Sequence, residues 1–176
     1  MKKFMINLPM SNTVLLFFMV LTSCSRKEDD LIAITTSGRN TMGVTIDKNY
    51  NVMGCQDIRC IFYCSGVSSY YRYGNLTVKG LFNDNFEIYL KAKIDSSFKI
   101  GDTLFFDKNN YITHAGIEYK GSKFESFTTD SLHKGFVVLT SLSEYGSSGT
   151  FQFESISPNT QSIKSIKNGR FDINCE

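Results

Sequence analysis

The chain has 176 residues with 19 basic and 17 acidic side chains, and 41% of its residues are hydrophobic. This length suits one domain with its own core. Two of the basic residues, Lys2 and Lys3, fall in a segment that we expect to be removed, which leaves 17 basic residues against 17 acidic ones. A protein that binds nucleic acid carries a basic excess on one face, so we exclude nucleic acid as a partner.

Residues 1–23 have the layout of an export signal peptide. A cationic start is followed by an apolar run, densest from Val14 to Leu21, and then by small residues. The uninterrupted apolar run is shorter than the ~20 residues of a membrane-spanning helix, so we expect the segment to be cleaved off. Leu21-Thr22-Ser23-Cys24 resembles the lipobox of bacterial lipoproteins. The resemblance implies a diacylglyceryl group on Cys24 and a membrane anchor made of acyl chains.

Residues 24–36 start with Cys24 and the charged run Ser25-Arg26-Lys27-Glu28-Asp29-Asp30. This run has no apolar residue and is too polar to join a core, so we interpret residues 24–36 as a solvated tether. Its acidic residues also resemble the surface-export signal of Bacteroidetes lipoproteins. That resemblance implies an outer membrane lipoprotein that faces the cell exterior, although a charged tether is common whatever the destination.

From Leu31 onward, apolar and polar residues alternate, which is typical of strands with one face on a core. The clearest segment is Phe86 to Ile94. The others are Met42 to Ile46, Leu76 to Phe82, Thr103 to Phe106, Phe124 to Thr128, Phe136 to Leu142, Thr150 to Ile156 and Arg170 to Asn174. Turn signals separate them, Gly146-Ser147-Ser148-Gly149 among these, and Ser65 to Tyr73 is unpatterned enough to hold a helical turn. We predict an all-β fold, a single antiparallel β-sandwich or barrel-like domain over residues 37–176.

Three motifs at the two ends of this domain carry a family resemblance. Gly38-Arg39-Asn40-Thr41-Met42-Gly43 is similar to the G-K-N-T-F-G opening of a group of Bacteroidetes lipoproteins with a shared domain of unknown function. Ser148-Gly149-Thr150-Phe151-Gln152-Phe153 and Asn168-Gly169-Arg170-Phe171-Asp172-Ile173 resemble the closing motifs S-G-T-F-x-F and N-G-x-F-D-V. The resemblance implies a lipid-anchored β domain with no established activity. Many members have cysteine where this chain has Val44, so a disulfide at that position does not transfer.

Four cysteines follow Cys24 in the chain, namely Cys55, Cys60, Cys64 and Cys175. In an exported chain an even number predicts at least one disulfide, with three pairings open. Their spacing lacks the paired C-x2-C of a zinc site and the C-x-x-C of a redox site, and only two histidines are present. We predict no metal and no cofactor.

The sequence has none of the standard catalytic motifs. We interpret the two histidines, His114 and His133, as solvated residues beside turns. Asp47-x-Asn49-x-Asn51 matches the first three ligand positions of a calcium loop, but Val52 and Ile58 stand where the loop needs glycine and glutamate. A hairpin turn is the better interpretation, because Asn and Asp tolerate a left-handed backbone.

Tyr70-Tyr71-Arg72-Tyr73 places three aromatic rings and a guanidinium in four residues. On a loop these rings would stack on a sugar or anchor a protein interface. Tyrosines in β proteins more often cover the edge of the core with their hydroxyls in water, and we favour that interpretation. The segment is still the first choice for a binding site.

Together these features predict a non-catalytic, lipid-anchored envelope protein that acts as a binding or structural accessory module. Its partners would be the membrane, through the lipid anchor, and an envelope protein or glycan. The alternative is an enzyme, a hydrolase of surface glycans with two carboxylates about 5–10 Å apart. A concave pocket that holds two acids would favour the enzyme, and a flat or aromatic-rimmed surface would favour binding.

Overall fold

The computed structural model describes residues 35–54, 66–82, 85–106, 113–121 and 124–174. The predicted signal peptide and all five cysteines, Cys24, Cys55, Cys60, Cys64 and Cys175, lie outside these residues. Among the residues described, no helix has the length and apolar character needed to cross a membrane.

The described residues form one all-β domain, which confirms the predicted fold class. Its strands are β1 (Thr41–Ile46), β2 (Asn49–Gly54), β3 (Val67–Arg72), β4 (Asn75–Phe82), β5 (Phe86–Lys93), β6 (Thr103–Phe106), β7 (His114–Lys120), β8 (Phe124–Thr128), β9 (Gly135–Leu142), β10 (Gly146–Ile156) and β11 (Ile163–Asn174).

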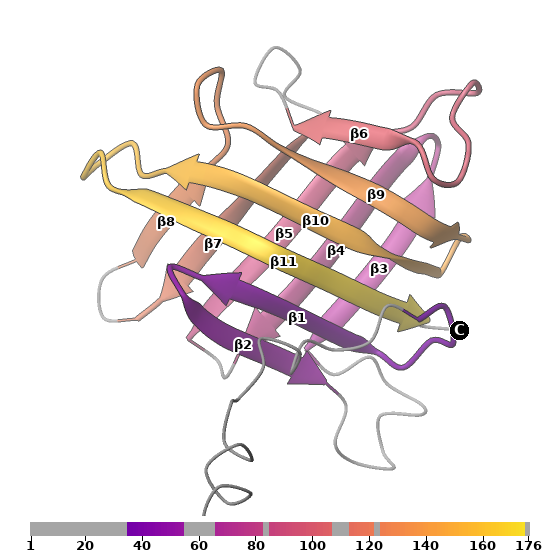
Figure 1. Ribbon diagram of the computed structural model, residues 1–176, viewed down its shortest axis with the longest axis horizontal. Coiled ribbons are helices and arrows are strands. Elements are labelled where there is room, and N and C mark those ends of the chain that lie inside the picture. The colour runs from indigo at the N-terminus through magenta and orange to yellow at the C-terminus, as the bar shows by residue number, and fades with distance from the viewer. Residues whose placement is uncertain (1–34, 55–65, 83–84, 107–112, 122–123, 175–176) are drawn as a thin grey trace, which may run out of the picture. The chain divides into compact units, whose positions relative to one another are not determined.

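A single antiparallel sheet curls into a half-barrel with two crossing layers (Figure 1). The front layer contains β2, β1, β11, β10, β9 and β6, and the back layer contains β8, β7, β5, β4 and β3. Strand β10 joins the layers, because Ser147 to Phe153 pair with β9 whereas Ile156 at its end pairs with Thr128 of β8. The core lies between the layers.

A β-bulge in β11 helps the front layer to curve over the core. Phe151 of β10 pairs with Gly169, and Phe153 pairs with Ile166, so two residues of β11 face one residue of β10. One of these two, Asn168, has a φ of 52°, a left-handed conformation that asparagine adopts more readily than most residues. Bulges bend a strand and increase its twist. The Asn-Gly pair of the third motif therefore shapes the sheet.

The core follows from the alternation along the strands, and its four largest fully buried side chains are phenylalanines. The ring of Phe151 lies 6.2 Å from that of Phe153 and 6.1 Å from that of Phe171. The largest buried side chains come from both layers, namely Phe82, Phe106, Phe127, Phe151, Met42, Leu76, Ile88, Leu90, Ile117, Leu139, Ile166 and Ile173.

All eight predicted strands are present, but the interpretation of two other segments was wrong. Residues 67–72, where we allowed a helical turn, form β3, and residues 146–149, which we predicted as a turn, open β10 and are buried. Their small side chains fit a crowded sheet, because a Cβ on Gly149 would meet the carbonyl of Val138. Strands β2 and β7 had no clear alternation. The calcium-like segment is a hairpin turn, as expected, with Asp47 and Lys48 at φ 46° and 82°.

We expect Gly169→Ala to destabilise the domain by about 1–3 kcal/mol, the usual cost of overpacking a core. A Cβ at this position would lie 2.6 Å from three atoms of the Phe151 ring, which is itself fixed by its neighbours. Gly121→Ala is the matched control, because a Cβ there meets nothing within 4 Å. Urea unfolding of the two purified variants gives the comparison. Equal stabilities would show that the ring yields to the added methyl group.

Candidate functional site

The predicted Tyr-Arg segment forms the end of β3 and the turn that follows it. Tyr71 points toward the core and packs against it, as our preferred interpretation expected. Tyr70 and Tyr73 do not, since they are 55% and 88% exposed. The packing interpretation is therefore right for Tyr71 and wrong for the other two tyrosines.

The turn between β3 and β4 holds Tyr73 in a conformation that tyrosine rarely adopts. Its two central residues, Tyr73 and Gly74, have φ values of 53° and 74°, the pattern of a type I′ turn. Such turns favour Asn-Gly, because a side chain with a bulky Cβ in the left-handed region costs about 1–2 kcal/mol. An almost fully exposed ring makes few contacts that would repay this cost. Strain of this kind is typical of functional sites.

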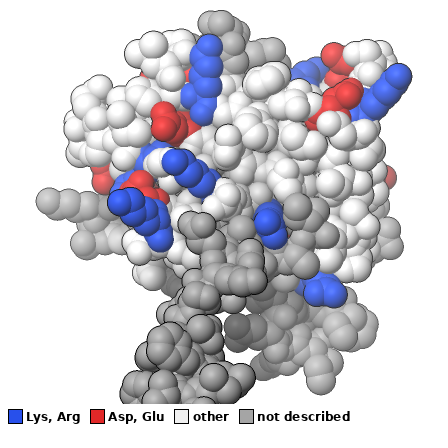
Figure 2. All heavy atoms as spheres, in the orientation of Figure 1, with Lys and Arg blue, Asp and Glu red and all other residues white. Residues whose placement is uncertain are grey.

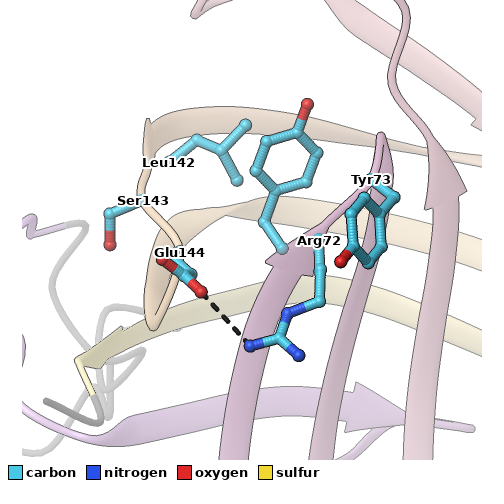
Figure 3. A pocket seen from close by; sticks show the side chains of 6 residues that line it. Arg72, Tyr73, Leu142, Ser143 and Glu144 are labelled. Carbon is cyan, nitrogen blue, oxygen red and sulfur yellow. Dashed lines mark hydrogen bonds and ion pairs between the residues drawn. The ribbon is translucent and has the colours of Figure 1, made fainter.

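A shallow depression of about 660 Å³ lies between this turn and the β9–β10 turn (Figure 3). We call it the hairpin-tip site. Its lining residues are Tyr71, Arg72, Tyr73, Leu142, Ser143 and Glu144. It therefore contains three of the four residues that the sequence had singled out, whereas Tyr70 lies outside it.

Two interactions join the hairpins across the hairpin-tip site. The backbone N–H of Tyr71 donates to the carbonyl of Glu144 at 2.9 Å. The Arg72 guanidinium lies 3.3 Å from the Glu144 carboxylate, and both side chains are more than half exposed. An ion pair this exposed stabilises a fold by no more than about 1 kcal/mol. Figure 3 shows Tyr73 beside Arg72, so both groups are presented to the same region of solvent.

The second turn repeats the pattern of the first. In each turn a charged residue precedes a tyrosine, Arg72 before Tyr73 and Glu144 before Tyr145. Tyr145 is 48% exposed. Glu144 and Tyr145 carry no signal of their own in the sequence, because only the fold brings the two turns together.

Two adjacent serines of β10 anchor the hairpin-tip site to the rest of the domain. Successive residues of a strand point to opposite faces, and both Ser147 and Ser148 are buried. The Ser147 hydroxyl oxygen lies 2.6 Å from that of Ser69 in β3, which ties the two layers together. On the other face, the Ser148 hydroxyl donates to Asp172 of β11 at 2.7 Å.

Asp172 is the one fully buried carboxylate among the described residues, with 1% of its surface exposed. Besides Ser148, it accepts hydrogen bonds from the backbone N–H groups of Ser37 at 3.2 Å and Gly38 at 2.9 Å. The hydroxyl of Thr35 donates to it as well. We had assigned Thr35 to the solvated tether, yet it is held against the last strand. The folded domain therefore begins no later than Thr35.

These donors also set the charge of Asp172. Burial alone would raise its pKa, but the hydrogen bonds from Thr35, Ser148 and the backbone of Gly38 and Arg39 outweigh burial and hold the pKa below its ordinary value. The group is thus a carboxylate with its oxygens occupied by donors. Such a group stabilises structure and is poorly suited to take up a proton as a general base.

The three motifs of the family resemblance meet at this carboxylate. Strand β11 lies between β1 and β10, so Gly38 of the first motif and Ser148 of the second both contact Asp172 of the third. Comparisons with protein-family models, with curated proteins and with solved structures find no match for this chain. The resemblance stays a prediction, and the structure gives its residues a physical role.

Neither histidine is solvated, contrary to our expectation. His133 has only 14% of its side chain exposed, and its Nδ1 lies 2.9 Å from Asp130 Oδ1. The same oxygen accepts the backbone N–H groups of His133 and Leu132, and these hydrogen bonds lower the pKa of Asp130. Asp130 and His133 therefore stabilise the loop between β8 and β9. His114 is half-buried at the start of β7, with its ring 5.7 Å from that of Tyr89.

One pair of acidic residues faces across neighbouring strands, Glu87 of β5 and Glu118 of β7. Lys79 and Lys120 bind Glu87 at 3.1 and 2.9 Å. Burial would raise the pKa of Glu87, but the hydrogen bonds and charges of the two lysines lower it overall. The general acid of a glycosidase needs a raised pKa, whereas the pKa of Glu87 is lowered.

Charges of both signs are interspersed on the face shown in Figure 2, and most of that face is uncharged. No basic patch of the kind that binds nucleic acid is visible there. Among the described residues, no group of three or more His, Cys, Asp or Glu side chains is placed to hold a metal ion.

We expect Asp172→Asn to lower the free energy of unfolding at pH 7 by about 2–3 kcal/mol, because the amide loses the charge and turns a donor toward other donors. The folded pKa is depressed, so the carboxylate contributes fully above its unfolded pKa of about 3.9. That contribution is lost as the pH falls through the folded pKa. Urea unfolding at pH 7 and pH 3 should therefore show a smaller difference between wild type and variant at pH 3. The control is Asp102→Asn, an exposed residue that accepts one backbone N–H, from Lys99.

The strain at Tyr73 predicts opposite effects of one substitution at two positions. Tyr73→Asn should raise the free energy of unfolding by about 1 kcal/mol, because asparagine tolerates the left-handed backbone and forms the preferred Asn-Gly turn. Tyr70→Asn should lower it, because Tyr70 lies in a regular strand where tyrosine is favoured over asparagine. Thermal unfolding of both variants measures the signs. A less stable Tyr73→Asn variant would mean that the ring contributes to folding.

Proposed function

We propose that this protein is an outer membrane lipoprotein, anchored through Cys24 and facing the cell exterior, that binds a ligand at its hairpin-tip site without catalysing a reaction. The lipobox-like Leu21 to Cys24 and the acidic residues behind it support the anchor and the outward orientation. The three motifs centred on Asp172 support membership of the Bacteroidetes lipoprotein group with a domain of unknown function.

The observation that carries the binding role is the conformation of Tyr73. An exposed ring on a strained backbone position reduces stability, and a ring that is 88% exposed buries little surface that would offset that cost. Rigid aromatic side chains lose little conformational entropy on binding, which suits them to be anchors for a ligand. The short turns on both sides of the depression fix the backbone that carries the ring before the ligand arrives.

Three carboxylates among the described residues lack the properties that the alternative, a glycan hydrolase, requires. Asp172 is occupied by hydrogen-bond donors, and Glu87 is held as an anion by two lysines. Glu144 at the hairpin-tip site faces Arg72 and lies on an open surface. A hydrolase instead needs a paired acid and base that enclose the scissile bond.

Site-specific photo-crosslinking in the native envelope tests the proposal. We expect the full chain with benzoylphenylalanine in place of Tyr73 to form a covalent adduct in intact cells, recovered in the membrane fraction. The same probe in place of Tyr70 is the matched control, because Tyr70 is exposed on β3, the strand that leads to this turn, but lies outside the depression. Equal labelling at both positions, or none at Tyr73, would contradict the binding role.

Two further samples in this experiment test the anchor and the orientation. Cys24→Ser removes the sulfur that carries the lipid, so the adduct should leave the membrane fraction, whereas Ser25→Ala should keep it there. Protease added to intact cells should remove the domain. A domain that is cut only after the cells are broken would show that it faces inward.

A further inference from the structure

We infer that the ligand of the hairpin-tip site is a neutral polysaccharide chain. This inference rests on the proposed function and names the class of ligand. Four properties of the site lead to it, namely its small size, its openness, the chemistry of its side chains and the balance of its charges.

The size of the site argues against a protein partner. A stable protein interface takes about 20–30 residues from each side. The hairpin-tip site has six lining residues, at the ends of two narrow turns. Of the exposed side chains of β3 and β4 outside the site, Ser68, Asn75 and Lys79 are polar. Tyr70 adds one aromatic ring, which is less than the apolar area of an interface core. A small recognition unit fits this surface better than a folded protein.

The openness of the site argues against a free metabolite. Sites for small molecules enclose most of the ligand surface, because a few contacts must offset the loss of its translational freedom. The depression is shallow and opens to solvent between the two turns (Figure 3). A polymer can bind even though each open site offers few contacts. Only a few of its units need to enter the depression, and many copies of the protein on a membrane can hold one chain.

The chemistry of the side chains matches a sugar. The exposed face of Tyr73 offers an apolar surface on which the C–H face of a pyranose ring can stack. Next to it, Arg72 supplies N–H donors and Glu144 supplies carboxylate acceptors, so together they satisfy adjacent hydroxyl groups, which both donate and accept. Leu142 adds apolar surface to the opposite wall.

The balance of charge points to a neutral chain. Arg72 and Glu144 compensate each other at 3.3 Å, so an anionic group placed on Arg72 would also face the Glu144 carboxylate. Lys93 lies near the turn, with its Nζ 3.8 Å from the position of a Cβ on Gly74, but it does not line the depression. Acidic polymers can therefore adsorb to Lys93 without entering the depression. An experiment must separate this adsorption from binding at the hairpin-tip site.

A glycan array with neutral and acidic oligosaccharides, probed with the full chain in detergent micelles, tests the inference. We expect binding to one or more neutral glycans that is unchanged between 0.05 and about 0.5 M salt, a range over which surface charges become screened. Tyr73→Asn should weaken it about tenfold or more. Tyr70→Asn, which makes the same substitution outside the depression, should leave it unchanged.

Three results would overturn the inference. One is the absence of any bound neutral glycan, another is equal weakening by the two substitutions, and the third is binding of acidic glycans alone that salt removes. Photo-crosslinking at Tyr73 in intact cells separates this failure from that of the proposed function. An adduct with a protein would leave the binding role standing and refute the polysaccharide, whereas no adduct and no glycan would refute both.

Discussion

The buried carboxylate of Asp172 joins parts of the chain that are far apart in sequence. It receives donors from two places in the chain. Thr35 and Gly38 lie in the segment before β1, and Ser148 lies at the start of β10. A charge with 1% exposure is costly unless every oxygen is occupied, so the position of each donor is fixed by the others. The order of β1, β11 and β10 in the front layer is the arrangement that lets all of them reach it.

The hydrogen bonds of Asp172 and of the neighbouring serine explain how an open depression between two turns can hold a defined shape. Ser148 contacts Asp172, and Ser147 beside it contacts Ser69 of the other layer, so the start of β10 is fixed on both faces. The β9–β10 turn, residues 143–145, ends with one residue, Gly146, between it and these serines, and β3 runs from Ser69 to the other turn. The two sides of the depression therefore derive their separation from buried hydrogen bonds, and the exposed Arg72–Glu144 pair adds only a weak contact.

Strands with clear alternation were predictable, because the pattern of apolar and polar residues lies within each strand and needs no knowledge of its neighbours. Strands β3 and β7 were not, since the residues that break their pattern have partners elsewhere in the fold. Ser69 is buried because Ser147 accepts or donates its hydrogen bond, and Gly116 interrupts β7 where the hydroxyl of Tyr89 would meet a Cβ. The same holds for the site. The tyrosine cluster was visible in the sequence, but its second wall and the burial of Asp172 depend on long-range contacts. The strained backbone of Tyr73 depends on the pairing of β3 with β4.

The hydrogen bond from Thr35 to Asp172 also has a mechanical consequence. Thr35 lies 137 residues before Asp172 in the chain, and its hydroxyl donates to the Asp172 carboxylate. A force that pulls Thr35 away from the β9–β10 turn would load the hydrogen bonds that Thr35 and Ser148 make with Asp172, because Ser148 lies two residues after Gly146 at the start of β10. Breaking these hydrogen bonds would leave a buried carboxylate with fewer donors, which is costly. The segment before β1 and the start of β10 are therefore coupled through the same carboxylate.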